Sequence, residues 1–149
     1  MKDATAITNL LYRYAELMDQ GDFAGVAKLF EHARIKVGLD EAAYLDASQI
    51  LAMWEETVIR YPDGTPRTKH VTTNAIVEFD DDGTTATARS YYTVFQQVDD
   101  TPLQPIICGR YHDRFEYVDG AWRWAERDYT LVDLVGDLSR HLRMEVPRT

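Results

Sequence analysis

Residues 68–79 read TKHVTTNAIVEF, and residues 85–98 read TATARSYYTVFQQV. Both stretches are rich in β-branched and aromatic residues, and apolar and polar side chains largely alternate along them, which is typical of β-strands. Between them, Asp81-Asp82-Gly83 is a turn signal. The two stretches therefore predict a long antiparallel hairpin.

Two more strands are expected further along the chain. Residues 103–117 and 121–131 alternate in the same way, and Asp119-Gly120 between them indicates a tight turn. Strands of about ten residues or more exceed the common length of roughly 5–6, so they must twist and bend. Residues 132–143 are expected to form a loose C-terminal helix.

The N-terminal half has the helical period instead. Apolar residues recur three and four positions apart over residues 3–18, which predicts a first helix. A second, short helix is expected after Asp22, a short strand over residues 35–39, and a third helix capped by Asp46 or Ser48. Helices followed by an antiparallel meander indicate the α+β class. We expect one domain, 1–149, with a cone-shaped, strongly curved antiparallel or mixed sheet, covered on one face by the N-terminal helices and enclosing a cavity.

Composition limits the classes of partner. The 149 residues include 25 acidic and 16 basic side chains, a net charge of −9, which opposes binding to nucleic acid or to an anionic membrane. No apolar run approaches the roughly 18 residues of a membrane span, and the N-terminus has no apolar signal region. The single cysteine, Cys108, favours a reducing, cytoplasmic compartment. Phosphate-loop, metal-cluster and nucleophile-elbow motifs are missing from the sequence, so we expect a small-molecule partner and neither metal nor cofactor.

One acidic residue breaks the alternation of its strand. Asp113 lies on the same face as Tyr111 and Phe115, and a carboxylate on an apolar face is unfavourable unless it is paired or protonated. An ion pair with Arg89 or Arg127 and a functional acid both fit this pattern.

His70 lies near the start of the first long strand. Alternation places it on the polar face, which lines either solvent or a polar pocket. The opposite face carries the apolar side chains of Val71, Val77 and Phe79. We expect that outer face to dock against a second copy of the chain, giving a homodimer or a higher homo-oligomer.

Two residues of the first helix have both a structural and a functional interpretation. Asp19 ends the helix, where the helix dipole disfavours a negative charge. It is either a turn residue or the holder of a partner in the pocket. Tyr14, one turn earlier, is either a core residue or a pocket hydroxyl, because a buried tyrosine hydroxyl needs a partner. His32 and His141 are expected at the surface.

Three stretches carry a resemblance to a known superfamily: residues 12–22 (YRYAELMDQGD), residues 70–74 (HVTTN), and residues 109–115 (GRYHDRF) followed by residues 119–123 (DGAWR). They are similar to the nuclear transport factor 2-like superfamily, in its SnoaL-like and scytalone dehydratase branch. The similarity covers nearly the whole chain, and it implies a cystatin-like α+β barrel.

The resemblance to scytalone dehydratase implies a histidine–aspartate pair at His70 and Asp19. The implied activity is that of a cofactor-independent lyase, most simply a dehydratase that acts on a small apolar or aromatic molecule. His70 would be the general base, and Asp19 would fix its tautomer and stabilise the imidazolium. This resemblance also favours the pocket over solvent as the surroundings of His70.

Further pocket residues are expected around this pair. Candidate hydrogen-bond donors for the substrate are Tyr14, Tyr111 and a protonated Asp113. Candidate apolar walls are Tyr44, Trp54, Tyr91 and Phe115. A comparison with ketosteroid isomerase places its catalytic base near Lys36 or Val37, where this sequence has no carboxylate, which argues against ketosteroid-type isomerisation.

Other functions remain open on the same scaffold. One alternative is a non-catalytic protein that binds a small molecule, or that assembles like the β subunit of an aromatic-ring dioxygenase. Another is an isomerase or a polyketide cyclase. A fold shared by many functions does not choose among these readings.

Overall fold

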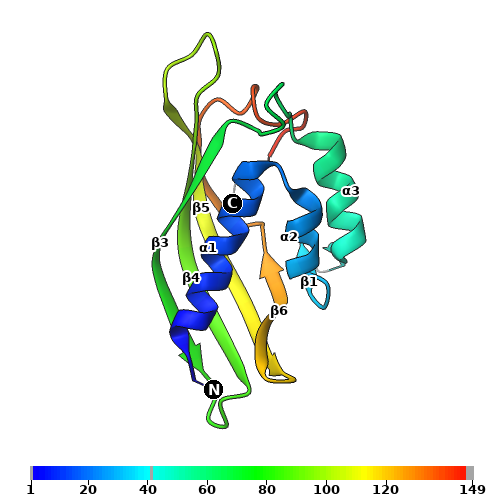
Figure 1. Ribbon diagram of the computed structural model, residues 1–149, viewed down its shortest axis with the longest axis vertical. Helices are drawn as coiled ribbons and strands as arrows, with labels where there is room; N and C mark the ends of the chain where they lie inside the picture. The colour runs from blue at the N-terminus through cyan, green and yellow to red at the C-terminus, as the bar shows by residue number, and fades with distance from the viewer. Residues whose placement is uncertain (1, 41, 147–149) are drawn as a thin grey trace.

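The computed structural model describes residues 2–40 and 42–146 and shows three helices packed on one side of a curved sheet (Figure 1). The helices are α1 (Ala4–Gln20), α2 (Phe23–Leu29) and α3 (Ala47–Thr57). The strands are β1 (Arg34–Lys36), β2 (Tyr44–Leu45), β3 (Thr68–Phe79), β4 (Thr85–Gln96), β5 (Gln104–Val118), β6 (Ala121–Asp128) and β7 (Val132–Val135).

The sheet has the order β2-β1-β6-β5-β4-β3, and β7 pairs with β5 beside this path. Its long strands are antiparallel neighbours, while β1 runs parallel to β6. The α+β class and the curved mixed sheet are therefore confirmed. The sheet does not close on itself, because β2 and β3 lie at opposite ends of the order.

Side-chain caps explain where the helices begin. The Asp3 carboxylate accepts a hydrogen bond from the backbone N–H of Ala6, and that of Asp22 accepts one from Gly25. Asp46 and Gln49 form a reciprocal capping box at the start of α3. Asp46 is therefore the cap, and the three helices predicted from the sequence are confirmed.

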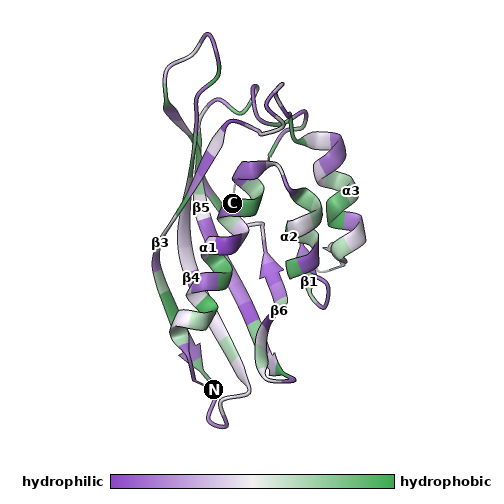
Figure 2. Ribbon diagram, in the orientation of Figure 1, coloured by the Kyte–Doolittle hydropathy of each residue, from purple (hydrophilic) through white to green (hydrophobic). Residues whose placement is uncertain are grey.

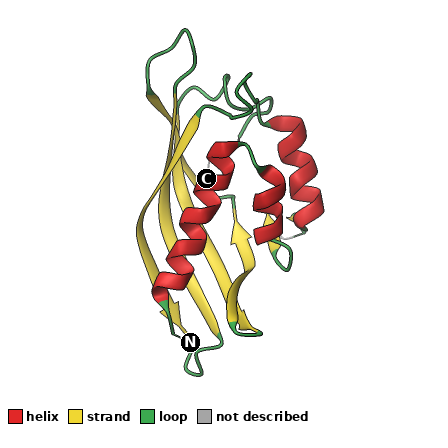
Figure 3. Cartoon of the chain, in the orientation of Figure 1, coloured by secondary structure: helices red, strands yellow, loops and turns green. Residues whose placement is uncertain are grey.

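Figure 3 shows one layer of helices over one layer of strands, and the core lies between the helices and the concave face of the sheet. Apolar bands alternate with polar ones along α1 (Figure 2), and the buried face of this helix includes Ile7, Leu11, Tyr14 and Met18. Each fully buried large apolar side chain contributes roughly 1.5–3 kcal/mol. This packing holds the C-terminal end of α1 against β3.

A bulge interrupts the alternation of β3. Between the pairs that Thr73 and Ile76 form with β4, β3 has two residues where β4 has one. Asn74, one of the two, has φ 40°, a left-handed conformation that asparagine tolerates better than most residues. An extra residue in one strand reverses which side chains face the core beyond it.

The bulge corrects one sequence-based placement. His70, before the bulge, faces inward, and Val77 and Phe79, after it, also pack against the core. Simple alternation predicted that Val77 and Phe79 belong to the outer face, and this prediction is wrong. The apolar side chains exposed on β3 are Val71 and Ile76.

The C-terminal segment differs from the expected helix. Val132–Val135 forms β7, which pairs with β5 at Ile107, Cys108 and Gly109. The physical reason is a difference in strand length. β5 has 15 residues and β6 has 8, so half of one edge of β5 is left for β7. No helix within residues 2–40 and 42–146 is long and apolar enough to cross a membrane.

Candidate functional site

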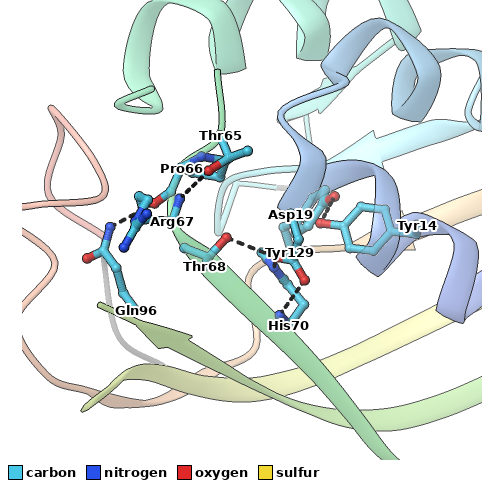
Figure 4. A network of polar contacts seen from close by, with 9 residues as sticks. All are labelled: Tyr14, Asp19, Thr65, Pro66, Arg67, Thr68, His70, Gln96 and Tyr129. Carbon is cyan, nitrogen blue, oxygen red and sulfur yellow. Dashed lines mark hydrogen bonds and ion pairs between the residues drawn. The ribbon is translucent and has the colours of Figure 1, made fainter. Parts of the chain in front are cut away.

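The structure brings His70 and Asp19 into direct contact (Figure 4). Nδ1 of His70 lies 2.6 Å from Oδ1 of Asp19, and the two side chains are only 7% and 11% exposed. Asp19 comes from the last turn of α1, and His70 from the third residue of β3. Gly21, two residues after the aspartate, ends α1 with φ 77° and allows the chain to turn there.

Two further hydrogen bonds hold the Asp19 carboxylate. The hydroxyl of Thr68 donates to Oδ1 at 2.9 Å, and the backbone N–H of His70 donates to Oδ2 at 2.9 Å. These donors offset the unfavourable position of a carboxylate at the C-terminal end of a helix. An ionised Asp19 can only accept, so the proton of a neutral His70 resides on Nδ1 and Nε2 carries the free lone pair.

His70 also lines an apolar cavity of about 240 Å³ beneath the helices. Its walls come from α1, α3, the long strands and the C-terminal segment, and they include Met18, Trp54, Val94, Ile107 and Leu142. Within the described part of the chain, the lining contains no aspartate, glutamate, lysine or arginine. Its polar groups are tyrosine and threonine hydroxyls and two imidazoles.

Tyrosines form one side of this cavity. The Tyr129 hydroxyl donates to the Tyr14 hydroxyl at 2.8 Å, and the ring of Tyr111 stacks on that of Tyr92 at 4.3 Å between centroids. All four tyrosines line the cavity. Burial raises the pKa of Tyr111 and of Tyr129 well above the usual value. Both therefore remain protonated and can donate hydrogen bonds at neutral pH.

Asp113 lies outside the cavity, in the core. Its two oxygens accept hydrogen bonds from Nε and Nη2 of Arg127 at 2.8 and 2.9 Å, and both side chains are fully buried. The structure thus selects Arg127 over Arg89 as its partner. With both oxygens accepting from a guanidinium, Asp113 does not supply the protonated donor that we expected to face a substrate.

Three other predicted wall residues also lie elsewhere. Phe115 is buried in the core against Trp124. Tyr91 is 55% exposed on the outer face of β4, since its neighbour Tyr92 takes the inward position. The ring of Tyr44 packs under the guanidinium of Arg34 at 4.1 Å, outside the lining of the cavity. Of the predicted wall and donor residues, Tyr14, Trp54 and Tyr111 line the cavity beside His70.

Tyr129 and His141 are among the cavity residues that sequence reasoning missed. Tyr129 lies beyond the end of β6, where a strand was expected to continue. His141 was expected at the surface and is instead 6% exposed and part of the cavity lining. No local pattern marks His141, because the contacts that bury it come from distant parts of the chain. His32, by contrast, is exposed as expected.

Among the described residues, no group of three or more histidine, cysteine, aspartate or glutamate side chains is arranged to hold a metal ion. His70 has an aspartate partner, whereas the cavity around it is apolar. This arrangement suits proton transfer in a water-poor space.

Comparison with known proteins now places the chain in a family. The sequence model of the SnoaL-like domain matches residues 1–128. The chain belongs to the SnoaL-like domain family. This confirms the resemblance that the three sequence stretches indicated. No curated protein matches the sequence of this SnoaL-like chain.

Solved structures similar to this SnoaL-like chain include three from Novosphingobium aromaticivorans. An NTF2-like protein with a cystatin-like fold is 24% identical, with 85% of this chain and 80% of that chain covered and a TM-score of 0.66. The β subunit of a putative aromatic-ring-hydroxylating dioxygenase is 19% identical, with coverages of 88% and 89% and a TM-score of 0.68. A putative scytalone dehydratase is 18% identical, with coverages of 97% and 87% and a TM-score of 0.62. At these identities the similarity shows a common fold, and the fold hosts several functions.

Proposed function

We propose that this SnoaL-like protein is a cofactor-independent lyase that dehydrates a small apolar or aromatic hydroxycarbonyl compound. The observation that carries the proposal is the contact between Asp19 and Nδ1 of His70, with the same imidazole lining an apolar cavity. A putative scytalone dehydratase is among the proteins of similar fold.

The proposed reaction begins with the free lone pair on Nε2 of His70. Nε2 takes a proton from the carbon next to a carbonyl, and the electrons of that C–H bond form a carbon–carbon double bond. The adjacent C–O bond breaks, and its electrons leave with the hydroxyl oxygen. The imidazolium returns the proton to that oxygen, so water departs and His70 is neutral again. Asp19 stabilises the transient imidazolium.

Tyr14 is the proposed donor to the carbonyl oxygen. Its oxygen accepts a hydrogen bond from Tyr129, which leaves the proton of Tyr14 free to be donated to a ligand in the cavity. A donor that accepts a hydrogen bond is polarised and becomes a stronger donor. Such a donor stabilises the negative charge that develops on the carbonyl oxygen as the C–H bond breaks.

The size of the cavity limits the substrate. An engineered apolar cavity of about 150 Å³ binds benzene, so a cavity of about 240 Å³ suits one or two fused rings. Without charged side chains among its described lining residues, the cavity favours a neutral molecule over a charged one.

The proposal is tested with 3-hydroxy-1-tetralone, a two-ring hydroxyketone that becomes fluorescent 1-naphthol when it loses water. We expect the wild-type protein to accelerate naphthol formation, and His70→Gln and Asp19→Asn to lose most of that acceleration. His32→Gln is the matched control, because this histidine is exposed and is not among the residues that line the cavity. Equal rates for wild type and His70→Gln would refute the lyase.

A binding or assembly function is the second candidate, supported by the fold shared with a dioxygenase β subunit. An isomerase or a cyclase would use the same base without loss of water. Exchange of the C2 hydrogens of 1-tetralone with deuterated solvent separates these cases. Exchange of 1-tetralone by a protein that does not dehydrate 3-hydroxy-1-tetralone favours the isomerase or cyclase. Tight binding of 1-tetralone without exchange or dehydration favours the binding protein.

We also propose that two copies pair through the outer face of the sheet. Val71 and Ile76 on β3 and Tyr91 on β4 are 40%, 44% and 55% exposed there, and apolar side chains gathered on one face favour association. Sedimentation velocity of wild type and Ile76→Lys measures this. A monomeric wild-type protein would contradict the pairing.

A further inference from the structure

His141 is a second imidazole of the cavity, for which the proposed reaction has no role. It is 6% exposed, and it lines the same cavity as His70. Its Nδ1 is buried and has no hydrogen-bond partner within the part of the chain that the structure describes. A buried polar atom without a partner is rare and destabilising, so a rotation of the ring that turns this nitrogen toward a partner in the cavity is favourable.

Hydrogen bonds attach the backbone of the segment that carries His141 to the rest of the protein. The carbonyl of His141 accepts a hydrogen bond from the N–H of Ile59 at 2.9 Å, and the N–H of Arg143 donates to Thr57 at 2.8 Å. The carbonyl of Arg140 accepts hydrogen bonds from Tyr61 and from the side chain of Gln96. These contacts fix the backbone on both sides of His141 in the cavity wall.

The surroundings of His141 keep its ring neutral. Burial lowers its pKa from the usual value to about 4, and a positive charge on His70 acts in the same direction, while Asp19 opposes both. The neutral imidazole has one N–H donor and one acceptor nitrogen. The two imidazoles of the cavity thus differ, since His70 has a carboxylate that stabilises its charged form, whereas His141 has none in contact among residues 2–40 and 42–146.

We infer that His141 is a ligand-binding residue whose ring nitrogen hydrogen-bonds the hydroxyl or carbonyl oxygen of a planar aromatic molecule in the cavity. This inference rests on the proposed function for the class of ligand. It does not require that any reaction occurs. The apolar walls hold the ring of the ligand, and His141 selects a ligand that has an oxygen over one of the same shape that lacks it.

The test compares 2-naphthol with 2-methylnaphthalene, which differ by a hydroxyl in place of a methyl group. Dissociation constants are measured by NMR titration at pH 7.5 on ¹⁵N-labelled protein, together with the ring nitrogen shifts of the histidines. We expect the wild type to prefer naphthol, and His141→Phe to reduce that preference by about tenfold, the effect of losing one hydrogen bond to a buried group. The His141 ring signal should move with naphthol and stay unchanged with methylnaphthalene.

His141→Gln provides the rescue, because an amide keeps a donor and an acceptor near the same place. It should retain more of the preference than His141→Phe, while His32→Phe, at an exposed site, should match the wild type. If His141→Phe does not fold, the shift of the His141 ring nitrogen in the wild type, with naphthol against methylnaphthalene, tests the inference alone. A preference unchanged in His141→Phe, or a ring signal that naphthol leaves unmoved, overturns the inference.

The remaining outcomes separate this inference from the proposed lyase. A wild-type protein that binds neither compound overturns the inference and the ligand class of the proposed function together. Binding of both with equal affinity overturns the inference alone. An inactive protein that shows the naphthol preference and the His141 signal supports the inference and removes the lyase.

Discussion

Two buried pairs of an aspartate with a basic side chain lie in this molecule, in different surroundings. Asp113 and Arg127 form two hydrogen bonds in the core, and both are fully inaccessible. Asp19 and His70 form one side-chain hydrogen bond, and the imidazole lines the cavity. The first pair is closed by protein on every side, whereas the second has one nitrogen turned toward a space that a molecule can enter.

The chemistry of the bases adds to this difference. The guanidinium of Arg127 lies 3.7 Å from the centroid of the Tyr111 ring and 4.3 Å from that of Tyr14. Burial lowers its pKa, but Asp113 more than offsets this, so the pKa is raised well above the usual value. Arg127 therefore keeps its proton at every accessible pH. An imidazole, unlike a guanidinium, can serve as a general base, so of the two pairs we propose the cavity pair for catalysis.

Removing one member of the closed pair should have the largest effect. Arg127→Met leaves Asp113 buried without its counter-charge, and we expect a loss of about 3–5 kcal/mol in the free energy of unfolding. Urea denaturation measures this. The double variant Arg127→Met, Asp113→Leu should recover much of the loss, because it leaves no charge in the core. A loss below about 1 kcal/mol for the single variant would contradict the structural role.

Substitution in the cavity pair should reduce the dehydration rate more than it reduces the free energy of unfolding. His70→Gln should reduce the dehydration of 3-hydroxy-1-tetralone by at least about 100-fold, the value of a general base. We expect the free energy of unfolding to change by less than about 2 kcal/mol, because the backbone N–H of His70 still donates to Asp19. A variant that loses stability and keeps its rate would reverse the distinction between the pairs.

His141, which has no carboxylate partner within the described residues, should make stability depend on pH. Its pKa in the folded protein is about 4, below its ordinary value of 6.5, so between these values the unfolded chain binds more protons. Stability therefore falls as the pH decreases from about 6.5 toward 4. From pH 7.5 to 4.5, wild type should lose about 2 kcal/mol more than His141→Gln in urea denaturation. Equal losses would show that His141 does not titrate this way.

The smallest effect is expected at Thr68, whose hydroxyl donates to Asp19. Thr68→Val removes this hydrogen bond and keeps the shape of the side chain, so we expect a loss of about 1 kcal/mol in stability and a several-fold lower rate. Thr93→Val is a matched control on β4, because Thr93 contacts Cys108 rather than the pair. A rate for Thr68→Val equal to that of the control would show that Asp19 needs no further support.

Local patterns predicted most of the fold. The capped helices and the two hairpins of the meander were identifiable because caps, turns and alternation act between residues close in sequence. The position of β7 was not, since it depends on the free edge that β5 offers beyond β6. The bulge at Asn74 was also hidden, although it decides that Val77 and Phe79 share the inner face with His70.

The sequence by itself determined the family, the α+β class and the two residues of the cavity pair, because residues 12–22 and 70–74 preserve a recognisable pattern. Only the tertiary structure decided which other polar side chains meet the cavity. It placed Asp113 against Arg127 in the core and brought His141 and Tyr129 to the cavity. Burial and pairing depend on residues far apart in the chain, so they are set when the sheet bends and the C-terminal segment packs against β4 and the end of α3.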